Sequence, residues 1–307
     1  MGIKLLNKFL LSHQTTTKCR HLSTFANKKI AIDISIYLYQ FKKESENWLS
    51  KLYRMCIILR HNRIRPVFVF DGFKRNVDKE KTLEKRREIR HKLFMKIEEL
   101  EIEEITEENK KLLNELKKET RRPNVNDIIK AKELITACGL KYLQPDGEAD
   151  EVCVELVNKN IVYACLSNDT DMFALGCKRI MKNFNIITHN LEFYNLTDVI
   201  KNINMDIESF KQLCILSGTD YNFTNKNIFY FYKMYIKYNK SLRLLENLQF
   251  LEWLLCNKKI TQQVYDEVVK VFEFYNNNNS LKQFKFMNIK NFKLNINEVN
   301  RLIFCKS

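Results

Sequence analysis

Two pairs of carboxylates lie close together in the sequence between residues 146 and 171. Glu148 stands two residues before Asp150, and Asp169 stands two residues before Asp171. Carboxylates at such short spacing repel one another unless water solvates them or divalent cations neutralise them. A solvated acidic loop explains one such cluster as well as a cation site does, so the rest of the chain must decide between the two.

The segment between the two pairs has the pattern of a helix followed by a buried strand. Residues 149–157 show helical periodicity, and the apolar run 161–166 has the β-branched and aromatic content of a strand. If the chain stays extended after this strand, Asp169 and Asp171 point to the same side. The first pair follows a Pro-Asp-Gly turn signal and lies where the helix should begin.

Two earlier apolar runs also end in aspartate. Asp33 lies near the end of the run 29–35, and Asp71 lies at the end of the run 66–72. A single aspartate after a strand is usually a turn or a helix cap. Because the carboxyl ends of parallel strands meet at one edge of an open sheet, three such strands would gather their acids in one crevice. We therefore predict an α/β fold with a central, mostly parallel sheet flanked by helices, and a metal site at its edge.

The chain is long and apolar enough for a substantial core, and it carries a large excess of positive charge. It has 307 residues, of which 45% are hydrophobic, a net charge of +15 and a pI near 9.3. This charge favours a polyanionic partner, either a nucleic acid or an acidic membrane surface. The composition alone would also suit a ribosomal or chromatin protein, whereas the acidic clusters indicate a protein that binds a polyphosphate and places metal ions on it.

The nine cysteines are odd in number and include no C-x-x-C spacing, which favours reduced thiols over disulfides or a structural zinc site. No apolar run is long enough to span a membrane. We expect an intracellular, reducing location, in the nucleus or at a viral replication site, and no membrane partner. The acid-free residues 1–29 partly resemble a mitochondrial presequence, an alternative that we disfavour.

Periodicity and turn signals predict further elements. We expect helices over residues 3–11, 36–59, 126–138, 196–203 and 209–216, and short strands over 141–143, 178–184 and 186–189. The helix over 126–138 should be capped by Asn124 or Asn126 and should end at Gly139. Residues 223–255 combine aromatic side chains with lysines at helical spacing. Such a pattern suits nucleic-acid contact, but it is more often a helix core with lysines at its margins.

Residues 73–122 differ from the rest of the chain because they are dense in Lys, Arg and Glu. Their sparse apolar residues favour one or two long charged helices that project from the sheet. A solvated helical hairpin is the simplest explanation for such a charge run. However, the first half is strongly basic and begins directly after Asp71, whereas residues 98–108 are acidic. We therefore expect the basic half to hang over the acidic crevice.

The ordered set of motifs resembles the flap endonucleases and their relatives, the structure-specific 5′ nucleases that include the xeroderma pigmentosum group G endonuclease. The resemblance covers residues 1–221. The motifs, in the family's order, are Met1-Gly2-Ile3 with Leu5, Ile30-Ala31-Ile32-Asp33-Ile34-Ser35, Val69-Phe70-Asp71-Gly72, Gly147-Glu148-Ala149-Asp150, Asp169-Thr170-Asp171 and Ser217-Gly218-Thr219-Asp220-Tyr221. The resemblance implies a PIN-like nuclease fold in which residues 73–122 form a helical arch that a single strand threads.

The resemblance also implies roles for individual side chains. The acids that look like the ligands of two Mg²⁺ ions, for which Mn²⁺ could substitute, are Asp33, Asp71, Glu148, Asp150, Asp169, Asp171 and Asp220. Lys79 and Arg86 look like the residues that contact the scissile phosphate, so we expect them to act in catalysis with Asp169 and Asp171. Arg90 should add to DNA binding on the same helix. Tyr39 looks like the aromatic that stacks on the nucleobase next to the cut, and Gly2 matches the small residue packed near the site.

The chain departs from the family pattern after Tyr221. Most members carry there a glycine-rich turn between two helices that binds duplex phosphates, whereas residues 222–238 contain no glycine. The residues that we expect to bind the duplex instead are Lys226, Lys233 and Lys237. A sliding-clamp motif is also absent from the sequence, and the Asn- and Lys-rich composition suggests a divergent member, such as one from a large DNA virus.

These observations predict a Mg²⁺-dependent, structure-specific 5′ flap endonuclease or 5′–3′ exonuclease that hydrolyses DNA in replication and repair. Two Mg²⁺ ions about 4 Å apart can stabilise both the attacking and the leaving oxygen and lower the pKa of a bound water. We expect a monomer that acts on branched or 5′-ended DNA. Its regions should be 1–95 and 123–221 for the nuclease, 73–122 for the arch, and 222–307 for a helical, basic and aromatic DNA-binding part.

Two alternatives remain open from the sequence. One is an RNA-directed nuclease with the same metal site. The other is a non-catalytic scaffold of the same fold that binds nucleic acid, against which the complete set of seven acids argues.

Overall fold

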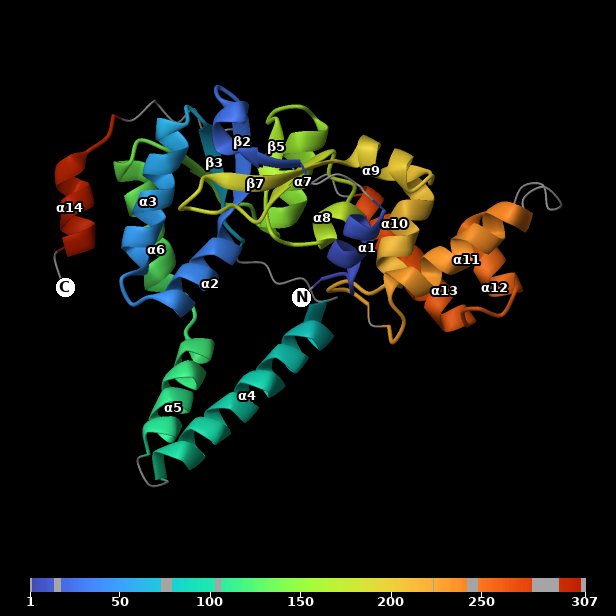
Figure 1. Ribbon diagram of the computed structural model, residues 1–307, viewed down its shortest axis with the longest axis horizontal. Coiled ribbons are helices and arrows are strands. Elements are labelled where there is room, and N and C mark those ends of the chain that lie inside the picture. The colour runs from blue at the N-terminus through green and yellow to red at the C-terminus, as the bar shows by residue number, and fades with distance from the viewer. Residues whose placement is uncertain are drawn as a thin grey trace. The chain divides into compact units, whose positions relative to one another are not determined.

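The computed structural model describes residues 2–13, 18–72, 79–102, 106–222, 224–241, 248–277 and 293–304 (Figure 1). The chain forms two compact units. The first, unit 1, contains residues 1–24 and 150–284, and the second, unit 2, contains residues 25–149 and 285–307. Parts of the predicted arch (73–78 and 103–105) and of the C-terminal region (223, 242–247, 278–292 and 305–307) lie outside the described residues.

Unit 2 is built on three parallel strands in the order β2-β3-β4. These are β2 (Lys29–Asp33), β3 (Arg65–Val69) and β4 (Lys141–Leu143). The helices that pack in this unit are α2 (Ile34–Glu44), α3 (Trp48–His61), α6 (Val125–Ala137) and α14 (Ile296–Phe304). Strand β2 is buried along four of its five residues, which explains its unbroken apolar sequence.

The single helix predicted over 36–59 is wrong, because the structure has two helices with a break at residues 45–47. Ser45 is extended, and its hydroxyl accepts a hydrogen bond from the Asn47 N–H at 3.1 Å. The Asn47 side chain in turn accepts one from the Ser50 hydroxyl at 2.8 Å. Such local side-chain bonds offer the backbone an alternative to helix, which apolar periodicity alone does not reveal.

The predicted caps of α6 are confirmed. Asn124 accepts a hydrogen bond from the Asp127 N–H, and the Asp127 carboxylate accepts one from the Asn124 N–H, both at 2.9 Å. Gly139 follows the helix end with a φ of +70°, a left-handed conformation that glycine adopts at no steric cost. Asparagine takes the same conformation at Asn27, Asn160, Asn183 and Asn204, in a chain that has only six glycines.

Unit 1 is built on four strands in the order β1-β7-β6-β5. They are β1 (Lys18–His21), β5 (Ala164–Leu166), β6 (Arg179–Lys182) and β7 (Asn190–Asn195). Strands β5 and β6 are parallel, whereas β7 is antiparallel to both β6 and β1. The predicted mostly parallel α/β sheet is therefore confirmed, with an antiparallel part that the sequence analysis did not include.

The strand predicted over 186–189 is wrong, since these residues form the turn before β7. The Asn185 side chain accepts hydrogen bonds from the N–H groups of Ile187 and Thr188, at 2.8 and 2.9 Å. His189 has a φ of +57°, which ends the turn. The turn thus depends on asparagine chemistry rather than on the apolar residues that suggested a strand.

The helices of unit 1 lie mostly where periodicity predicts them. They are α1 (Leu6–Ser12), α7 (Ala149–Asn158), α8 (Asp171–Ala174), α9 (Leu196–Asn202), α10 (Ile207–Leu216), α11 (Ile228–Ser241), α12 (Phe250–Cys256) and α13 (Gln262–Asn277), with a short 3-10 turn (Leu22–Phe25) at the boundary of the units. Helix α11 buries Phe231, Met234 and Tyr235 while Lys233 and Lys237 are exposed. The aromatic and basic pattern is thus a helix core with exposed lysines.

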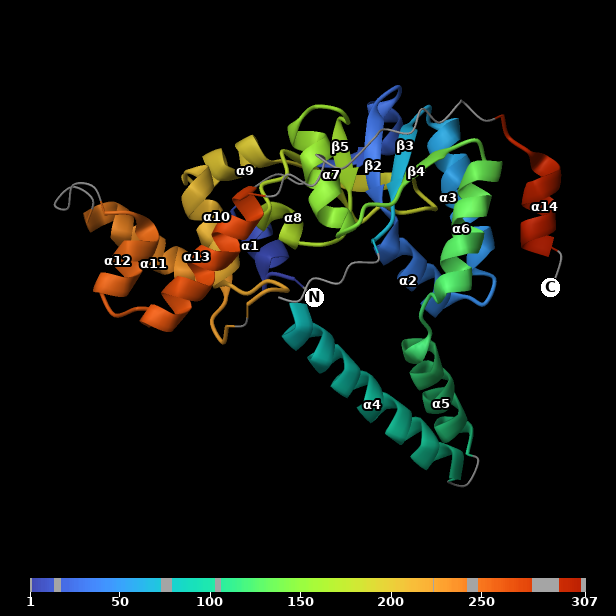
Figure 2. The same ribbon diagram turned by 180° about the vertical axis from the view of Figure 1, so that it is seen from behind.

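Two charged helices, α4 (Glu80–Ile102) and α5 (Glu107–Thr120), pack against each other and extend away from the strands of unit 2 (Figures 1 and 2). Lys117 of α5 pairs with Glu101 of α4 at 2.6 Å, and Lys43 of α2 pairs with Glu119 of α5. Of the one or two long charged helices predicted over 73–122, the described residues form two. None of the described helices combines the length and the apolar character needed to cross a bilayer.

Candidate active site

Asp33 lies at the point where β2 ends and α2 begins. It is the last residue of the strand, and its carboxylate accepts a hydrogen bond from the Ser35 N–H at 3.2 Å as the helix N-cap. Its side chain is buried, with 5% of the residue exposed.

Asp71 follows β3 by two residues and is joined to the loop that precedes α7. Its Oδ1 atom accepts a hydrogen bond from the Ala149 N–H at 3.1 Å. The adjacent Gly72 donates its N–H to the Gly147 carbonyl at 2.7 Å. A Cβ atom at Gly72 would lie 2.2 Å from the Asp146 carbonyl oxygen, so this close approach requires glycine. The glycine thereby brings Asp71 beside the segment that carries Glu148.

Glu148 forms an ion pair with Lys79, which stands directly before α4. The two side chains are 21% and 14% exposed, respectively. Unit 2 thus brings together three residues that the sequence analysis singled out, namely Asp71, Glu148 and Lys79. The ion pair also connects Lys79, directly before α4, to the loop before α7 that carries Glu148, which we call the acidic loop.

Asp169 and Asp171 lie in a turn and not in an extended segment, so the condition under which alternation would place both on one side is not met. The Asp169 Oδ1 atom accepts a hydrogen bond from the Asp171 N–H at 2.9 Å, and Asp171 begins α8. Thr170 between them is helical, with φ −80° and ψ −17°. The Asp169 side chain accepts the Asp171 N–H, and this local hydrogen bond folds the backbone into a turn. The alternation of an extended strand therefore does not apply to this pair.

Asp171 is connected to Asp220 through the backbone. Its Oδ2 atom accepts a hydrogen bond from the Asp220 N–H at 3.1 Å, and the residue is only 3% exposed. The loop after α10 is held by Asn222, whose side chain accepts from the Thr219 hydroxyl at 2.7 Å and donates to the Ile215 carbonyl at 2.7 Å. Unit 1 therefore joins Asp169, Asp171 and Asp220 in one chain of hydrogen bonds.

Asp150 lies in the first turn of α7, where its Oδ1 atom accepts a hydrogen bond from the Glu151 N–H at 2.8 Å. Each of the unit 1 carboxylates described so far, apart from Asp220, thus uses one oxygen to accept a backbone N–H. Such a bond restricts the rotamer of the side chain and so fixes the direction of the second carboxylate oxygen.

Gly2 packs directly against the acids of unit 1. A Cβ atom there would lie 2.2 Å from the Thr170 hydroxyl oxygen and 3.1 Å from Asp169 Oδ1. The φ of Gly2 is +104°, and the next N–H, of Ile3, donates to the Thr170 hydroxyl at 2.8 Å. The expected placement of a small residue near the acids therefore agrees with the geometry.

Two buried groups respond to these acids electrostatically. Burial lowers the pKa of the Lys182 ammonium to about 8, although the charges of Asp169, Glu192 and Asp171 act in the opposite direction. Lys182 is 1% exposed and donates to the Asn7 side chain of α1 at 3.2 Å. Burial also raises the pKa of the Cys214 thiol well above its usual value, with a further contribution from the Asp171 charge.

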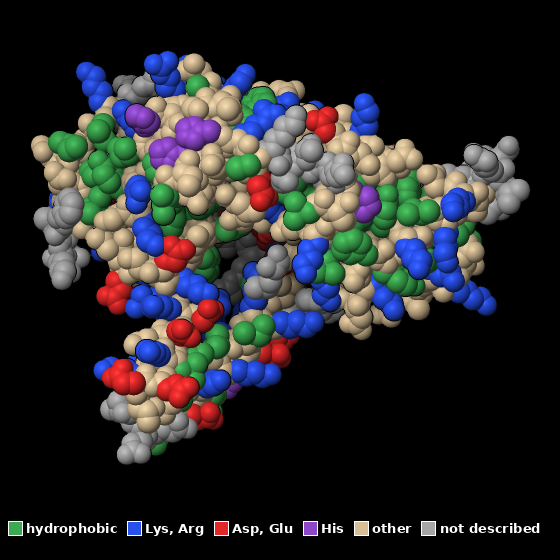
Figure 3. All heavy atoms as spheres, in the orientation of Figure 1, with side chains coloured by type: hydrophobic (Ala, Val, Ile, Leu, Met, Phe, Trp, Pro, Cys, Tyr) green, Lys and Arg blue, Asp and Glu red, His purple; other side chains and the backbone are tan. Residues whose placement is uncertain are grey.

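Two of the basic residues expected on the arch, Arg86 and Arg90, share one face of α4. Arg86 and Arg90 are half-buried and lie four residues apart, in line with the buried Thr82. Figure 3 shows many Lys and Arg side chains along this helix. Tyr39 of α2 is 49% exposed, so its ring is accessible for stacking.

The lysines expected to bind duplex DNA lie on exposed surface of unit 1. Lys233 and Lys237 are one turn apart on α11. Lys226 lies in the preceding loop, with its ammonium 4.9 Å from the centre of the Tyr230 ring.

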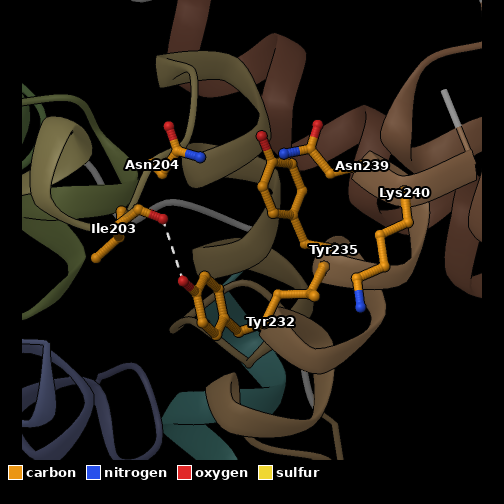
Figure 4. Close-up of a pocket in the computed structure, with 7 residues that line it drawn as sticks. Ile203, Asn204, Tyr232, Tyr235, Asn239 and Lys240 are labelled. Atoms are coloured by element: carbon orange, nitrogen blue, oxygen red, sulfur yellow. Dashed lines mark hydrogen bonds between the residues drawn. The ribbon is translucent and has the colours of Figure 1, made fainter. Parts of the chain in front are cut away.

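A cavity of about 480 Å³ lies beside the same helix but contains none of the seven acids (Figure 4). Its lining consists of Ile203, Asn204, Tyr232, Tyr235, Ile236, Asn239 and Lys240. The Tyr232 hydroxyl donates to the Ile203 carbonyl at 3.1 Å, and burial, with the Asp206 charge, raises the pKa of Tyr235 to about 12. The cavity has no carboxylate for metal chemistry, and we assign no role to it.

The donor set of the acids suits a hard, hydrated cation. Within the ranges that the structure describes, no three His, Cys, Asp or Glu side chains form a ready-made metal-binding group. Mg²⁺ retains several waters and needs only one or two direct carboxylates, so a closed cage is not required. A buried hydroxyl, that of Tyr275 in α13, lies near Asp171 and Asp150 and has no hydrogen-bond partner among the described residues. An oxygen-only donor set with a spare buried hydroxyl fits a hydrated divalent ion.

Sequence reasoning missed Lys182 and Tyr275. A lysine within the apolar run of a predicted strand was a usable signal for Lys182, because a buried ammonium needs nearby acids. Tyr275 precedes an asparagine run and lies 55 residues after Asp220, so no motif or spacing connects it with the acids.

Two family models match the chain. Residues 1–93 match the XPG N-terminal domain, and residues 139–220 match the XPG I-region. All seven acids and both predicted phosphate contacts, Lys79 and Arg86, lie within these two segments.

Flap endonuclease 1 of Encephalitozoon cuniculi is 30% identical over 247 residues, which cover 74% of this chain and 70% of that protein. Flap endonuclease 1 of Plasmodium falciparum is 29% identical over 281 residues, which cover 81% of this chain and 42% of that protein. The chain thus spans less than half the length of its Plasmodium relatives.

Solved structures show the same fold. The catalytic core of Rad2 in complex with DNA substrate has a TM-score of 0.70 at 22% identity, with 98% of this chain and 94% of that chain covered. Human GEN1 in complex with Holliday junction DNA has a TM-score of 0.62 at 16% identity, with 98% and 72% covered. The predicted PIN-like nuclease fold is confirmed by these likenesses. Together with the two family models and the Encephalitozoon relative, they show that the chain belongs to the family of XPG and flap endonucleases.

Proposed function

We propose that this protein is a divalent-metal-dependent, structure-specific 5′ nuclease that hydrolyses DNA at 5′ flaps or free 5′ ends. The observation that carries the proposal is the complete set of seven acids, each positioned by a strand end, a helix start or a backbone hydrogen bond, in a member of this family. A scaffold protein would have no need to keep all seven, and the two that are buried, Asp33 and Asp171, carry a desolvation cost.

The residues that would hold the ions are Asp33, Asp71, Glu148, Asp150, Asp169, Asp171 and Asp220. Bound Mg²⁺ supplies Lewis-acid stabilisation of the phosphodiester oxygens and a water of lowered pKa. Two ions, with Mn²⁺ as a substitute, are our specific expectation. The hydrogen bonds to Asp71, Asp169 and Asp171 orient these carboxylates.

Lys79 and Arg86 supply positive charge for the phosphate. Both stand at the base of α4, and Arg90 continues the same face one turn further along. A guanidinium can donate two parallel hydrogen bonds to phosphate oxygens, which fixes the phosphate and stabilises its charge as the bond breaks. Because this charge develops in the transition state, the contribution of Arg86 belongs mainly to the rate.

Recognition of the DNA would use the remaining predicted residues. The exposed ring of Tyr39 can stack on a nucleobase. Gly2 leaves room beside Asp169 that any side chain would fill. Lys226, Lys233 and Lys237 offer exposed ammonium groups to duplex phosphates, in place of a glycine-rich turn.

Cleavage of a labelled 5′-flap DNA tests the proposal directly. The substrate is compared with its blunt duplex, with its single strand and with an RNA flap of equal sequence, in Mg²⁺, in Mn²⁺ and in EDTA. Asp169→Asn removes the charge while its side-chain oxygen can still accept the Asp171 N–H. Asp198→Asn, at an exposed acid of α9, is the matched control.

We expect cleavage at the flap junction by the wild type and by Asp198→Asn, and none by Asp169→Asn. Preference for plain duplex ends would make the enzyme an exonuclease, and preference for the RNA flap would make it an RNA-directed nuclease. Absence of wild-type cleavage on every branched substrate would refute the proposal and favour a scaffold.

A further inference from the structure

Helix α13 brings a tyrosine from the C-terminal region to the acids of unit 1. Tyr275 is 6% exposed, and its ring packs edge-on against Tyr221, with the ring centres 5.6 Å apart and the planes at 87°. Phe274 packs on the same Tyr221 ring at 5.1 Å. Tyr221 follows Asp220 directly, so α13 lies against the loop that joins Asp220 to Asp171. Neither segment matched by the family models includes Tyr275.

The Tyr275 hydroxyl is buried without a hydrogen-bond partner among the described residues. The Thr219 side chain is near enough to act on the hydroxyl in the direction of a lower pKa, but the contact lacks the geometry of a hydrogen bond. Leaving a buried hydroxyl unpaired costs about 1–3 kcal/mol. A phenylalanine at position 275 would fill the same space without this cost, and the preceding residue, Phe274, is a phenylalanine. A buried polar group of this kind points to a partner such as a water or an ion.

The surroundings of the hydroxyl indicate which partner it meets. Burial, followed by the negative charge of Asp171, raises the pKa of Tyr275 well above its usual value, and Asp150 adds to the effect. The phenol is therefore a neutral donor, and Asp171 and Asp150 are the carboxylates whose charges act on it. A neutral donor can orient a carboxylate, or a water between two carboxylates, without competing with a cation for them.

We propose that Tyr275 is a positioning residue of the metal site, donating its hydroxyl hydrogen to Asp171 or to a water that joins Asp171 and Asp150 when a divalent cation is bound. This inference rests on the proposed function, since it assigns the residue to the same acids. It extends the site beyond Asp220 to α13 and makes this helix part of what holds the cation. Groups that orient metal ligands in this way typically change metal affinity about 10–100-fold when they are removed.

The test is Tyr275→Phe, which keeps the ring contacts with Tyr221 and removes only the oxygen. Tyr265→Phe, at a half-exposed tyrosine of the same helix, is the matched control. Mn²⁺ is titrated into the full-length protein without DNA, and the free ion is measured by its electron paramagnetic resonance signal. Thermal unfolding of the metal-free protein is recorded in parallel.

We expect Tyr275→Phe to bind Mn²⁺ about 10-fold or more weakly, with a thermal midpoint that is unchanged or higher. The Mg²⁺ concentration for half-maximal cleavage should rise by a similar factor, and saturating Mg²⁺ should restore the rate. A purely structural role would lower the thermal midpoint and leave the Mn²⁺ affinity within twofold, and this result would overturn the inference.

The two proposals fail in different ways. Wild-type protein that binds Mn²⁺ but cleaves no branched DNA refutes the proposed function, while weaker Mn²⁺ binding by Tyr275→Phe would still support the inference. Wild-type protein that cleaves the flap, with equal Mn²⁺ affinity in both tyrosine variants, refutes the inference alone. Wild-type protein that binds no Mn²⁺ refutes the inference irrespective of cleavage.

Discussion

Gly72→Ala should slow catalysis about 100-fold in a protein that still folds. The added Cβ atom would lie 2.2 Å from the Asp146 carbonyl oxygen and 2.3 Å from the Pro145 carbonyl oxygen, whereas ordinary contact begins near 3.4 Å. The two segments must therefore separate by about 1.2 Å. Both neighbours are backbone atoms, so no side-chain rotation relieves the clash.

The separation acts on Asp71 and on the loop of Glu148 together. The hydrogen bonds at risk are the one from Gly72 N–H to the Gly147 carbonyl at 2.7 Å and the one from Ala149 N–H to Asp71 at 3.1 Å. Overpacking of this kind costs about 1–3 kcal/mol of folding free energy. A displacement of about 1 Å in a catalytic group can cost about 100-fold in rate. We expect a loss of that size in kcat on the flap substrate.

The assay compares single-turnover cleavage with urea unfolding for the wild type, Gly72→Ala and Ile135→Val. Ile135 is a fully buried residue of α6 in the same unit, and its truncation costs about 0.5–1.5 kcal/mol without touching the acidic loop. The control should therefore be destabilised but keep its rate. A Gly72→Ala protein that cleaves as fast as the control would refute the argument from close approach.

Four further outcomes are expected. Arg86→Ala should lower kcat about 100-fold or more but weaken flap binding much less; equal losses would make the residue an electrostatic anchor only. Tyr39→Ala should weaken substrate binding by about 1–3 kcal/mol, while Tyr39→Phe keeps the stacking; equal binding by both variants would exclude stacking. The pKa of Lys182 is about 8 in the folded protein and 10.5 when exposed, so the unfolded chain binds more protons between these two pH values. The free energy of unfolding should therefore rise with pH from about 8 to 10.5. Urea titrations of the wild type and Lys182→Met should show this rise only in the wild type. Replacing Lys233 and Lys237 together with Gln should reduce the slope of log affinity against log salt by about 2; an unchanged slope would place the duplex elsewhere.

The ends of the parallel strands could be predicted because two independent signals agree there. Apolar runs such as 29–33 and 65–69 specify buried strands; Asp33 is the last residue of the first, and Asp71 lies two residues beyond the second. The cap at Asn124 and the left-handed Gly139 depend only on local chemistry. Features of this kind are encoded within about one helical turn of sequence, so a single chain reveals them.

The missed features depend on contacts or on side-chain competition that periodicity does not contain. The break at 45–47 and the turn at Asp169 arise from side chains that bond their own backbone. Strand β1 is short and pairs with β7, which lies about 170 residues later in the chain, so its assignment needs the partner. The approach of Tyr275 to the acids likewise depends on tertiary packing. The amphipathic sequence of α13 specifies which face of the helix is buried, but not which segment that face packs against.

The ion pair between Lys79 and Glu148 has a thermodynamic consequence for how the protein meets its ligands. A divalent cation that engages Glu148 and a phosphate that engages Lys79 each replace this same internal contact. Whichever ligand binds first has already removed the contact that the second must displace, so the two affinities are linked and each ligand strengthens the other by the same factor. A coupling of about 1 kcal/mol corresponds to about a fivefold change. The ion pair would thus produce positive cooperativity, because it favours the complex with both metal and DNA over the complex with either ligand alone.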